Sequence, residues 1–204
     1  MKKIDIVIKQ QTGLKKGSTN IPYMAHLQNG YSTLNDVFAV GGMDVTGWYP
    51  LGQLKQFNLM HIREILDEMA DYQQITSDSV MDGPLYVLVT YNYKSANSDL
   101  DNQIVTKFLF DAMASYWVIF DKDGSFIERR IVDQHDRNST KETASYLKQL
   151  GFKKLMENDN VNHVKAIQSL VINPEDRDKS VNYARVEIWD DRDEYLDAIV
   201  NRMP

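Results

Sequence analysis

The segments PLYVLVTYNY at residues 84–93 and SDLDN at residues 98–102 decide the fold that we expect for this chain. Apolar residues alternate along the first segment, which predicts a β-strand. Its apolar face consists of Leu85, Val87, Val89 and Tyr91. After the second segment, apolar residues recur at helical spacing, so we expect a strand, a short acidic connection and an amphipathic helix. The helical stripe consists of Ile104, Val105, Phe108, Leu109, Ala112 and Met113.

Strand and helix patterns continue on both sides of this unit. Residues 4–8 predict a first strand, and residues 54–69 carry apolar side chains at helical spacing. The stretch 10–50 between them is rich in Gly, Asn, Ser and Thr, which favours a long irregular connection. Residues 116–132 predict a β-hairpin, because the Asp-Lys-Asp-Gly sequence at 121–124 is a strong turn signal between apolar runs.

The last third of the chain contains further helix and strand signals. The Ser-Thr-Lys-Glu sequence at 139–142 is a capping box that opens a short helix, and Gly151 suits its end. Residues 163–172 and 182–189 predict two closing strands, and residues 193–203 predict an additional C-terminal helix. This mixture of strands and helices indicates an α+β fold with a mixed β-sheet packed by helices.

Composition limits the class of protein. With 204 residues, of which 43% are hydrophobic, we expect one globular domain over residues 1–204. The absence of cysteine excludes thiol nucleophiles, disulfides and zinc–thiolate sites. No apolar run approaches the roughly 18 residues that span a bilayer, and the N-terminus lacks a signal-peptide pattern, so we expect a cytoplasmic protein without a membrane partner. The net charge of −6 argues against binding nucleic acid with the whole surface.

Asp99 and Asp101 are the main candidates for chemistry. In extended backbone, residues two apart point to the same side, and two neighbouring carboxylates favour a shared cation. Mg²⁺ prefers such oxygen ligands together with a phosphate, and the N-terminus of the following helix offers N–H groups to that phosphate. The same acids are also ordinary helix caps that need no metal. Both interpretations are open from these residues alone.

The DLDN sequence at 99–102, with FDAM at 110–113 closing the next helix, resembles the RusA-type Holliday-junction resolvases, or crossover junction endodeoxyribonucleases. Members of this family are phage and bacterial nucleases that cut branched DNA as Mg²⁺-dependent homodimers. Residues 151–164 look like the family's acidic segment, and the Ala-Arg-Val-Glu-Ile run at 184–188 looks like its last strand. The resemblance implies a RusA-like domain in which residues 116–150 are an inserted hairpin and helix.

The resemblance also implies roles for individual residues. Asp99, Asp101 and Asp159 would bind Mg²⁺, or Mn²⁺ in its place, and the metal would generate a hydroxide nucleophile at the scissile phosphate. Asn102 would support the turn or the metal ligands. The chain would then be a hydrolase of DNA recombination and repair, with branched DNA as its substrate and a second copy as its partner. The resemblance places it in the cytoplasm of a bacterium or of a phage-infected host.

Two departures from the family pattern favour a second hypothesis. The family's helix lysine falls on Val105 here, which leaves Lys107 as the nearest candidate for the catalytic lysine. Asn158 replaces the first member of the family's acidic pair, so that only Asp159 is left. The alternative is therefore a RusA-like binding protein that has lost catalysis, or an acidic phage protein that imitates DNA.

Three further residues are weaker candidates. Asp123 competes with Asp159 as the third carboxylate, although its place in the Asp-Lys-Asp-Gly turn already explains it. Lys15 and Lys16 are candidates for contacts with DNA phosphates, and a solvated loop pair is an equally good interpretation.

Overall fold

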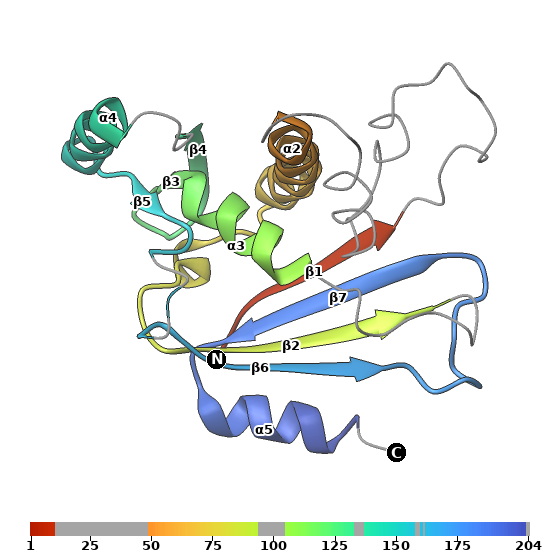
Figure 1. The fold of residues 1–204 in the computed structure, drawn as a ribbon. Helices are drawn as coiled ribbons and strands as arrows, with labels where there is room; N and C mark the ends of the chain where they lie inside the picture. The colour runs from red at the N-terminus through yellow and green to blue at the C-terminus, as the bar shows by residue number, and fades with distance from the viewer. Residues whose placement is uncertain (11–48, 94–104, 133–136, 158–159, 161, 203–204) are drawn as a thin grey trace.

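A computed structural model describes the chain in six segments. These are residues 1–10, 49–93, 105–132, 137–157, 160 and 162–202. The described part contains two β-sheets and four α-helices, which confirms the predicted α+β class (Figure 1). No helix within it is long and apolar enough to cross a membrane.

The larger sheet has four strands in the order β1-β7-β2-β6. Its strands are β1 (Lys2–Gln10), β2 (Leu85–Asn92), β6 (Val164–Val171) and β7 (Asn182–Trp189). β7 pairs antiparallel with both β1 and β2, whereas β6 pairs parallel with β2. The predicted mixed sheet is therefore present, and all four of its strands coincide with predicted ones.

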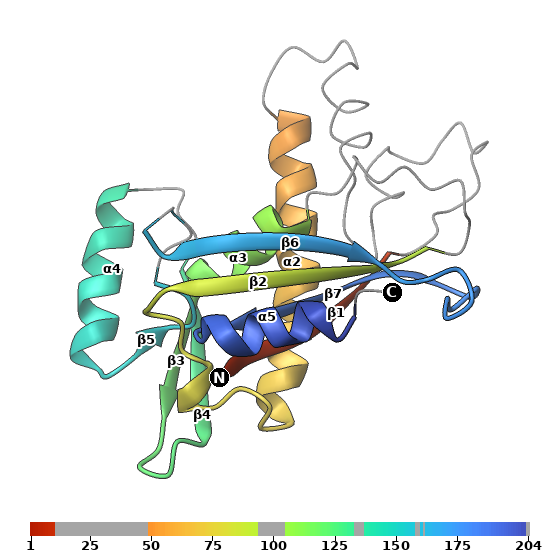
Figure 2. The same ribbon diagram turned by 90° about the horizontal axis from the view of Figure 1, so that it is seen from below.

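Helices cover both faces of this sheet, which is why β2 is buried on both sides. α2 (Tyr49–Asp71) and α3 (Val105–Ser115) lie over one face, and α5 (Arg192–Val200) lies on the opposite face (Figures 1 and 2). Val87 and Val89 belong to the core under α2 and α3. Leu88 points the other way and packs with residues of α5 and β7 in a second cluster.

The predicted helices α2 and α5 are present, with different bounds. α2 begins at Tyr49, five residues before the predicted start, and Pro50 suits the first turn of a helix because it needs no hydrogen bond there. α5 begins at Arg192, where the Asp191 carboxylate accepts hydrogen bonds from the Asp193 and Glu194 backbone N–H groups.

The predicted hairpin is present, and it belongs to a second sheet rather than to the main one. β3 (Tyr116–Phe120) lies between β4 (Phe126–Ile131) and β5 (Lys153–Lys154) in an antiparallel three-stranded sheet. A two-residue strand such as β5 has no alternation to read in the sequence. The connecting turn has Gly124 at φ +82°, as its Asp-Gly sequence predicts.

Helix α4 (Arg137–Gln149) packs on the second sheet. Its predicted start was wrong, whereas its predicted end at Gly151 is confirmed. It begins two residues before Ser139, because a capping pattern favours a start without preventing the preceding residues from continuing the helix. At its other end, Gly151 has φ +87°, its N–H donates to Lys148 O at 3.1 Å, and the Phe152 N–H donates to Leu147 O at 3.0 Å. This pair of bonds is a Schellman motif.

The two sheets share one apolar core. It includes residues of both sheets and of the two helices between them, among them Ile6, Ile62, Val87, Leu109 and Val118. A smaller cluster of Trp117, Leu147 and Phe152 joins α4 to the outer face of the second sheet. The hairpin and α4 are thus attached to the main sheet through shared burial of β3.

We expect the Gly151→Ala change to lower the free energy of unfolding by about 1–2 kcal/mol, because an L-residue is strained at positive φ. The nearest atom to an added Cβ is the Ile119 Cδ1 at 3.6 Å, so conformation rather than crowding causes the loss. Urea denaturation measures it. The matched control is Gly83→Ala, where nothing lies within 4 Å of the added Cβ, and a change within about 0.5 kcal/mol is expected there. Equal effects at both glycines would contradict the assignment of the α4 terminus.

Candidate functional site

Strand β2 and helix α3 flank the DLDN motif as the sequence predicts, but the motif itself is not described. Asp99, Asp101 and Asn102 lie outside the described residues, and so does Asp159. The same holds for the two candidate DNA contacts in the long N-terminal connection, Lys15 and Lys16. The predicted metal site therefore stays a prediction, and the structure describes the elements around it.

The described residues on either side of Asp159 lie at the amino end of β2. The Glu157 N–H donates to Met81 O at 3.0 Å, and the Leu85 N–H donates to His163 O at 2.6 Å. This segment therefore leads into β6 beside the first residue of β2.

Asp99 and Asp101 follow the other, carboxyl end of β2, which is eight residues long. At a rise of about 3.3 Å per residue, the two ends of β2 are roughly 23 Å apart. Six residue steps separate Tyr93 from Asp99, and an extended chain covers about 20 Å in six steps. Asp99 and Asp101 can therefore share a metal with Asp159 only if the connection between β2 and α3 runs back toward the amino end of β2.

Lys107 lies in the first turn of α3 and is bound to Asp111. The two side chains form an i,i+4 ion pair of 2.6 Å, and the Lys107 side chain is 62% exposed. Val105, where the resemblance would have placed a lysine, is completely buried in the core. Because positions i and i+2 of a helix are rotated by about 200° about its axis, Lys107 points away from the side that Val105 occupies.

The rival carboxylate Asp123 lies in the β3–β4 turn, where the sequence places it. The turn is closed by the Asp121 carboxylate, which accepts hydrogen bonds from the Asp123 and Ser125 N–H groups at 2.9 and 2.8 Å. The Ser77 N–H donates to Gly124 O at 2.9 Å, which ties the turn to the 3₁₀ helix η2 (Ser77–Ser79). Within the six described segments, no group of three or more His, Asp or Glu side chains could hold a metal ion.

A charged cluster on the α5 side of the main sheet is the strongest polar feature that the sequence did not reveal. Asp5 of β1 and Glu187 of β7 are direct cross-strand partners, so two carboxylates face each other. Arg185 donates to both Asp5 oxygens, from Nε at 2.8 Å and from Nη2 at 2.5 Å. Lys2 bridges the pair, with its Nζ 2.8 Å from Asp5 and 3.3 Å from Glu187.

Glu187 is only 1% exposed, and cations compensate its burial. Arg202, which follows α5, donates from both terminal nitrogens to the two Glu187 oxygens, with 2.9 Å between Nη2 and Oε1. Burial raises the pKa of Asp5, but the hydrogen bonds from Arg185 and Lys2 outweigh it and hold that pKa below the usual 3.8. The hydrogen bond with Asp5 raises the pKa of Arg185.

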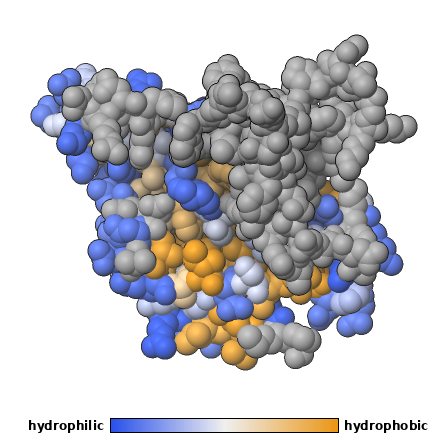
Figure 3. All heavy atoms as spheres, in the orientation of Figure 1, coloured by the Kyte–Doolittle hydropathy of each residue, from blue (hydrophilic) through white to orange (hydrophobic). Residues whose placement is uncertain are grey.

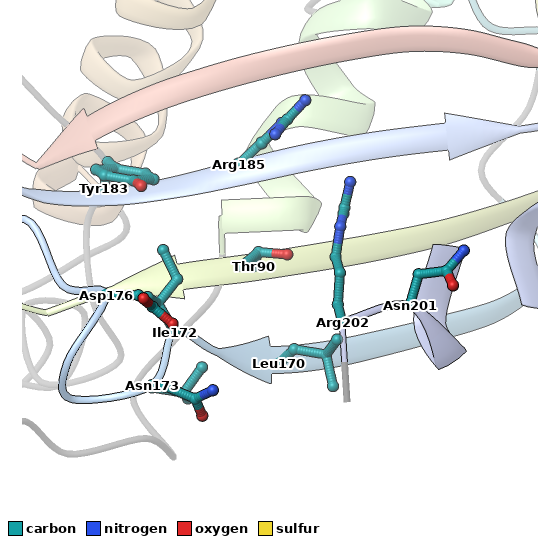
Figure 4. A pocket seen from close by; sticks show the side chains of 10 residues that line it. Thr90, Leu170, Ile172, Asn173, Asp176, Tyr183, Arg185, Asn201 and Arg202 are labelled. Carbon is teal, nitrogen blue, oxygen red and sulfur yellow. The ribbon is translucent and has the colours of Figure 1, made fainter. Parts of the chain in front are cut away.

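A hollow of about 390 Å³ adjoins this cluster, between the sheet face and the end of α5 (Figure 4). Its lining includes Thr90, Tyr183, Arg185, Asn201 and Arg202. Both arginines already bind internal carboxylates, so the hollow presents hydrogen-bonding groups rather than unpaired positive charge. This arrangement fixes the C-terminal end of α5 on the sheet, and it does not form a strong phosphate site.

Comparisons with protein-family models, with curated proteins and with solved structures found no match for this chain.

We expect Asp5→Asn to lower the free energy of unfolding at pH 7 by about 1 kcal/mol, which is below the roughly 1.5–3 kcal/mol of charge-assisted hydrogen bonds because Arg185 is 41% exposed. The lowered pKa means that the carboxylate stabilises the fold above pH 3.8 and loses this contribution as the pH falls through its folded value. Urea denaturation from pH 7 down to about pH 2 should therefore show the wild type and variant converging in acid. Asp197→Asn on the exposed side of α5 is the control, and an Asp5 variant as stable as this control at pH 7 would be the contrary result.

Proposed function

We propose that this protein is a Mg²⁺-dependent endonuclease that hydrolyses phosphodiester bonds in branched DNA, resembling the RusA-type Holliday-junction resolvases and acting as a homodimer. The observation that carries the proposal is the position of the Asp-Leu-Asp-Asn motif. It lies between the end of β2 at Asn92 and the start of α3 at Val105. A strand before and a helix after the motif are what a carboxylate site beside a phosphate-accepting helix N-terminus needs.

The order of elements also supports the proposal. Along the chain, β1, α2, β2, α3, β6 and β7 follow one another in the order that the resemblance implies. The second sheet and α4 interrupt that order between α3 and β6, which is the place of the inserted hairpin and helix.

The donor set fits a hard divalent cation. Asp99, Asp101 and Asp159 offer carboxylate oxygens, which Mg²⁺ prefers, and Mn²⁺ accepts the same ligands. When bound, the metal supplies a hydroxide nucleophile and neutralises charge on the phosphate. In this proposal Asp99 and Asp101 would bind the metal in front of α3, and Asp159 would have to reach them from the segment before β6.

A second candidate function, binding without catalysis, is favoured by the state of α3. The family's lysine position is the buried Val105, and Lys107 is held by Asp111 at 2.6 Å on another side of the helix. Such a protein would keep the RusA-like arrangement and bind DNA or a protein without cutting. The two candidates differ in whether a divalent ion is bound and whether a junction is cleaved.

We expect the wild type to cut a synthetic four-way junction with Mg²⁺ and to stop when the metal is chelated. Asp99→Asn or Asp101→Asn should lower the cleavage rate by about 100-fold or more, since each removes a charged metal ligand. Asp197→Asn on α5 changes the charge equally and should cut at the wild-type rate. Cleavage unaffected by both motif variants would refute the proposal, and absence of cleavage with any divalent ion would favour the binding protein.

We also expect Mg²⁺ or Mn²⁺ to raise the melting temperature, because a ligand that binds only the folded state stabilises it by mass action. The shift should grow with metal concentration and should vanish in the Asp99→Asn/Asp101→Asn double variant. Differential scanning fluorimetry with and without chelator measures it. An identical shift in the double variant would mean that the ion binds elsewhere.

A further inference from the structure

The segment from α4 to β5 is basic in an otherwise acidic chain. Residues 137–154 contain five basic residues and one acidic residue. Since the whole chain has 23 basic and 29 acidic residues, the remainder holds 18 basic and 28 acidic ones. Residues 137–154 therefore carry a local charge balance of +4, and this segment lies at the edge of the molecule (Figures 1 and 2).

Three of the four lysines of this segment are exposed, and the fourth, Lys154, is half-buried. Lys141 and Lys148 are both exposed and, being seven residues apart, lie on the same side of α4. Lys153 of β5 is exposed as well, and Lys154 lies with its Nζ 5.6 Å from the centre of the Trp117 ring, a cation–π distance. We call these four lysines the α4–β5 surface. Hydrophilic residues cover this side of the molecule in Figure 3.

Several arginines of the main sheet, of β4 and of the residues after α5 are instead paired with neighbouring acids. Arg185 binds Asp5, and Arg202 binds Glu187. Arg129 binds Asp67 with 2.5 Å between Nε and Oδ1.

The α4–β5 surface has almost no such compensation. Among the described residues, no ion pair includes Lys141, Lys153 or Lys154. Lys148 has one loose contact, 3.7 Å from the Glu157 carboxylate, which is itself 45% exposed. Loose, exposed pairs contribute little and exchange easily for another anion.

Helix α4 holds this surface with little burial of its own. Only Leu147 is buried and Ala144 partly buried among its described side chains, and both pack on the sheet beside Trp117. The Schellman motif at Gly151 then fixes the direction from the helix into β5. Most of the described side chains of α4 are therefore open to a partner.

We propose that the α4–β5 surface binds the phosphate backbone of the branched DNA substrate. This inference rests on the proposed function. The α4–β5 surface would supply the positive field that a chain of net charge −6 needs in order to hold a polyanion. Lysine ammonium groups on a helix flank and an adjacent strand make contacts with phosphates that carry no sequence information, so they position the duplex arms of a junction without reading bases. Exposed Tyr146, on the other flank of α4, is not part of this contact.

Fluorescence anisotropy with a labelled four-way junction tests the inference, using the Asp99→Asn/Asp101→Asn variant as the parent so that the DNA stays intact. We expect Lys141→Gln/Lys148→Gln to weaken binding about tenfold at moderate salt. The dependence of log K on log salt should also become shallower by about two, because each lost phosphate contact removes roughly 0.9 from that slope. Lys141→Arg/Lys148→Arg should restore both.

The matched control is Lys122→Gln/Lys179→Gln, which removes the same charge from the β3–β4 turn and the β6–β7 connection. Circular dichroism and urea denaturation establish that each variant folds. If the α4 pair and the control pair weaken binding equally, or neither does, the inference is overturned while the proposed function stands. If the parent binds no junction and the wild type cuts none, the proposed function fails first.

Discussion

Burial of β2 on both faces is the constraint on which the rest of the structure depends. Val87 and Val89 must lie under a helical layer and Leu88 under another, so the chain has to supply α2 and α3 on one side and α5 on the other. Both edges of β2 are also paired, with β7 antiparallel and β6 parallel. The parallel pairing has a further consequence. The segment before β6 must start at the amino end of β2, whereas the DLDN motif follows its carboxyl end.

The elements that were predictable from the sequence are those with long periodic patterns. β7 was predicted with its observed bounds, and α3 and the β3–β4 hairpin were recognised from helical spacing and from an Asp-Gly turn. β5 was missed because two residues carry no period, and the start of α4 was misplaced because a cap pattern does not prevent an earlier start. These errors concern local signals that tertiary packing overrides, and the second sheet exists only because β3 has a partner on each side.

The candidate site shows a different limit of sequence reasoning. A motif identifies residue types and their distance along the chain, but it does not give the phase of a helix or the register of a sheet. The burial of Val105 depends on the phase of α3, which points this side chain into the core. The cluster around Asp5 and Glu187 depends on the β1–β7 register, which makes two distant acids direct neighbours. Arg185 and Glu187 are two apart on one strand, and that spacing was the one signal available.

The distribution of ion pairs gives this acidic protein a local basic surface. Cations that satisfy internal carboxylates, such as Arg185 and Arg202, contribute to folding and little to the external field. Only lysines without close acids raise the potential outside the molecule, and the Debye length of about 8 Å at physiological salt limits their range. A segment with several such lysines on one side makes the potential positive over that range, even though the net charge of the chain is negative. Net charge alone therefore does not argue against the proposed contact with DNA, because the local pairing of charges decides where such a contact is favoured.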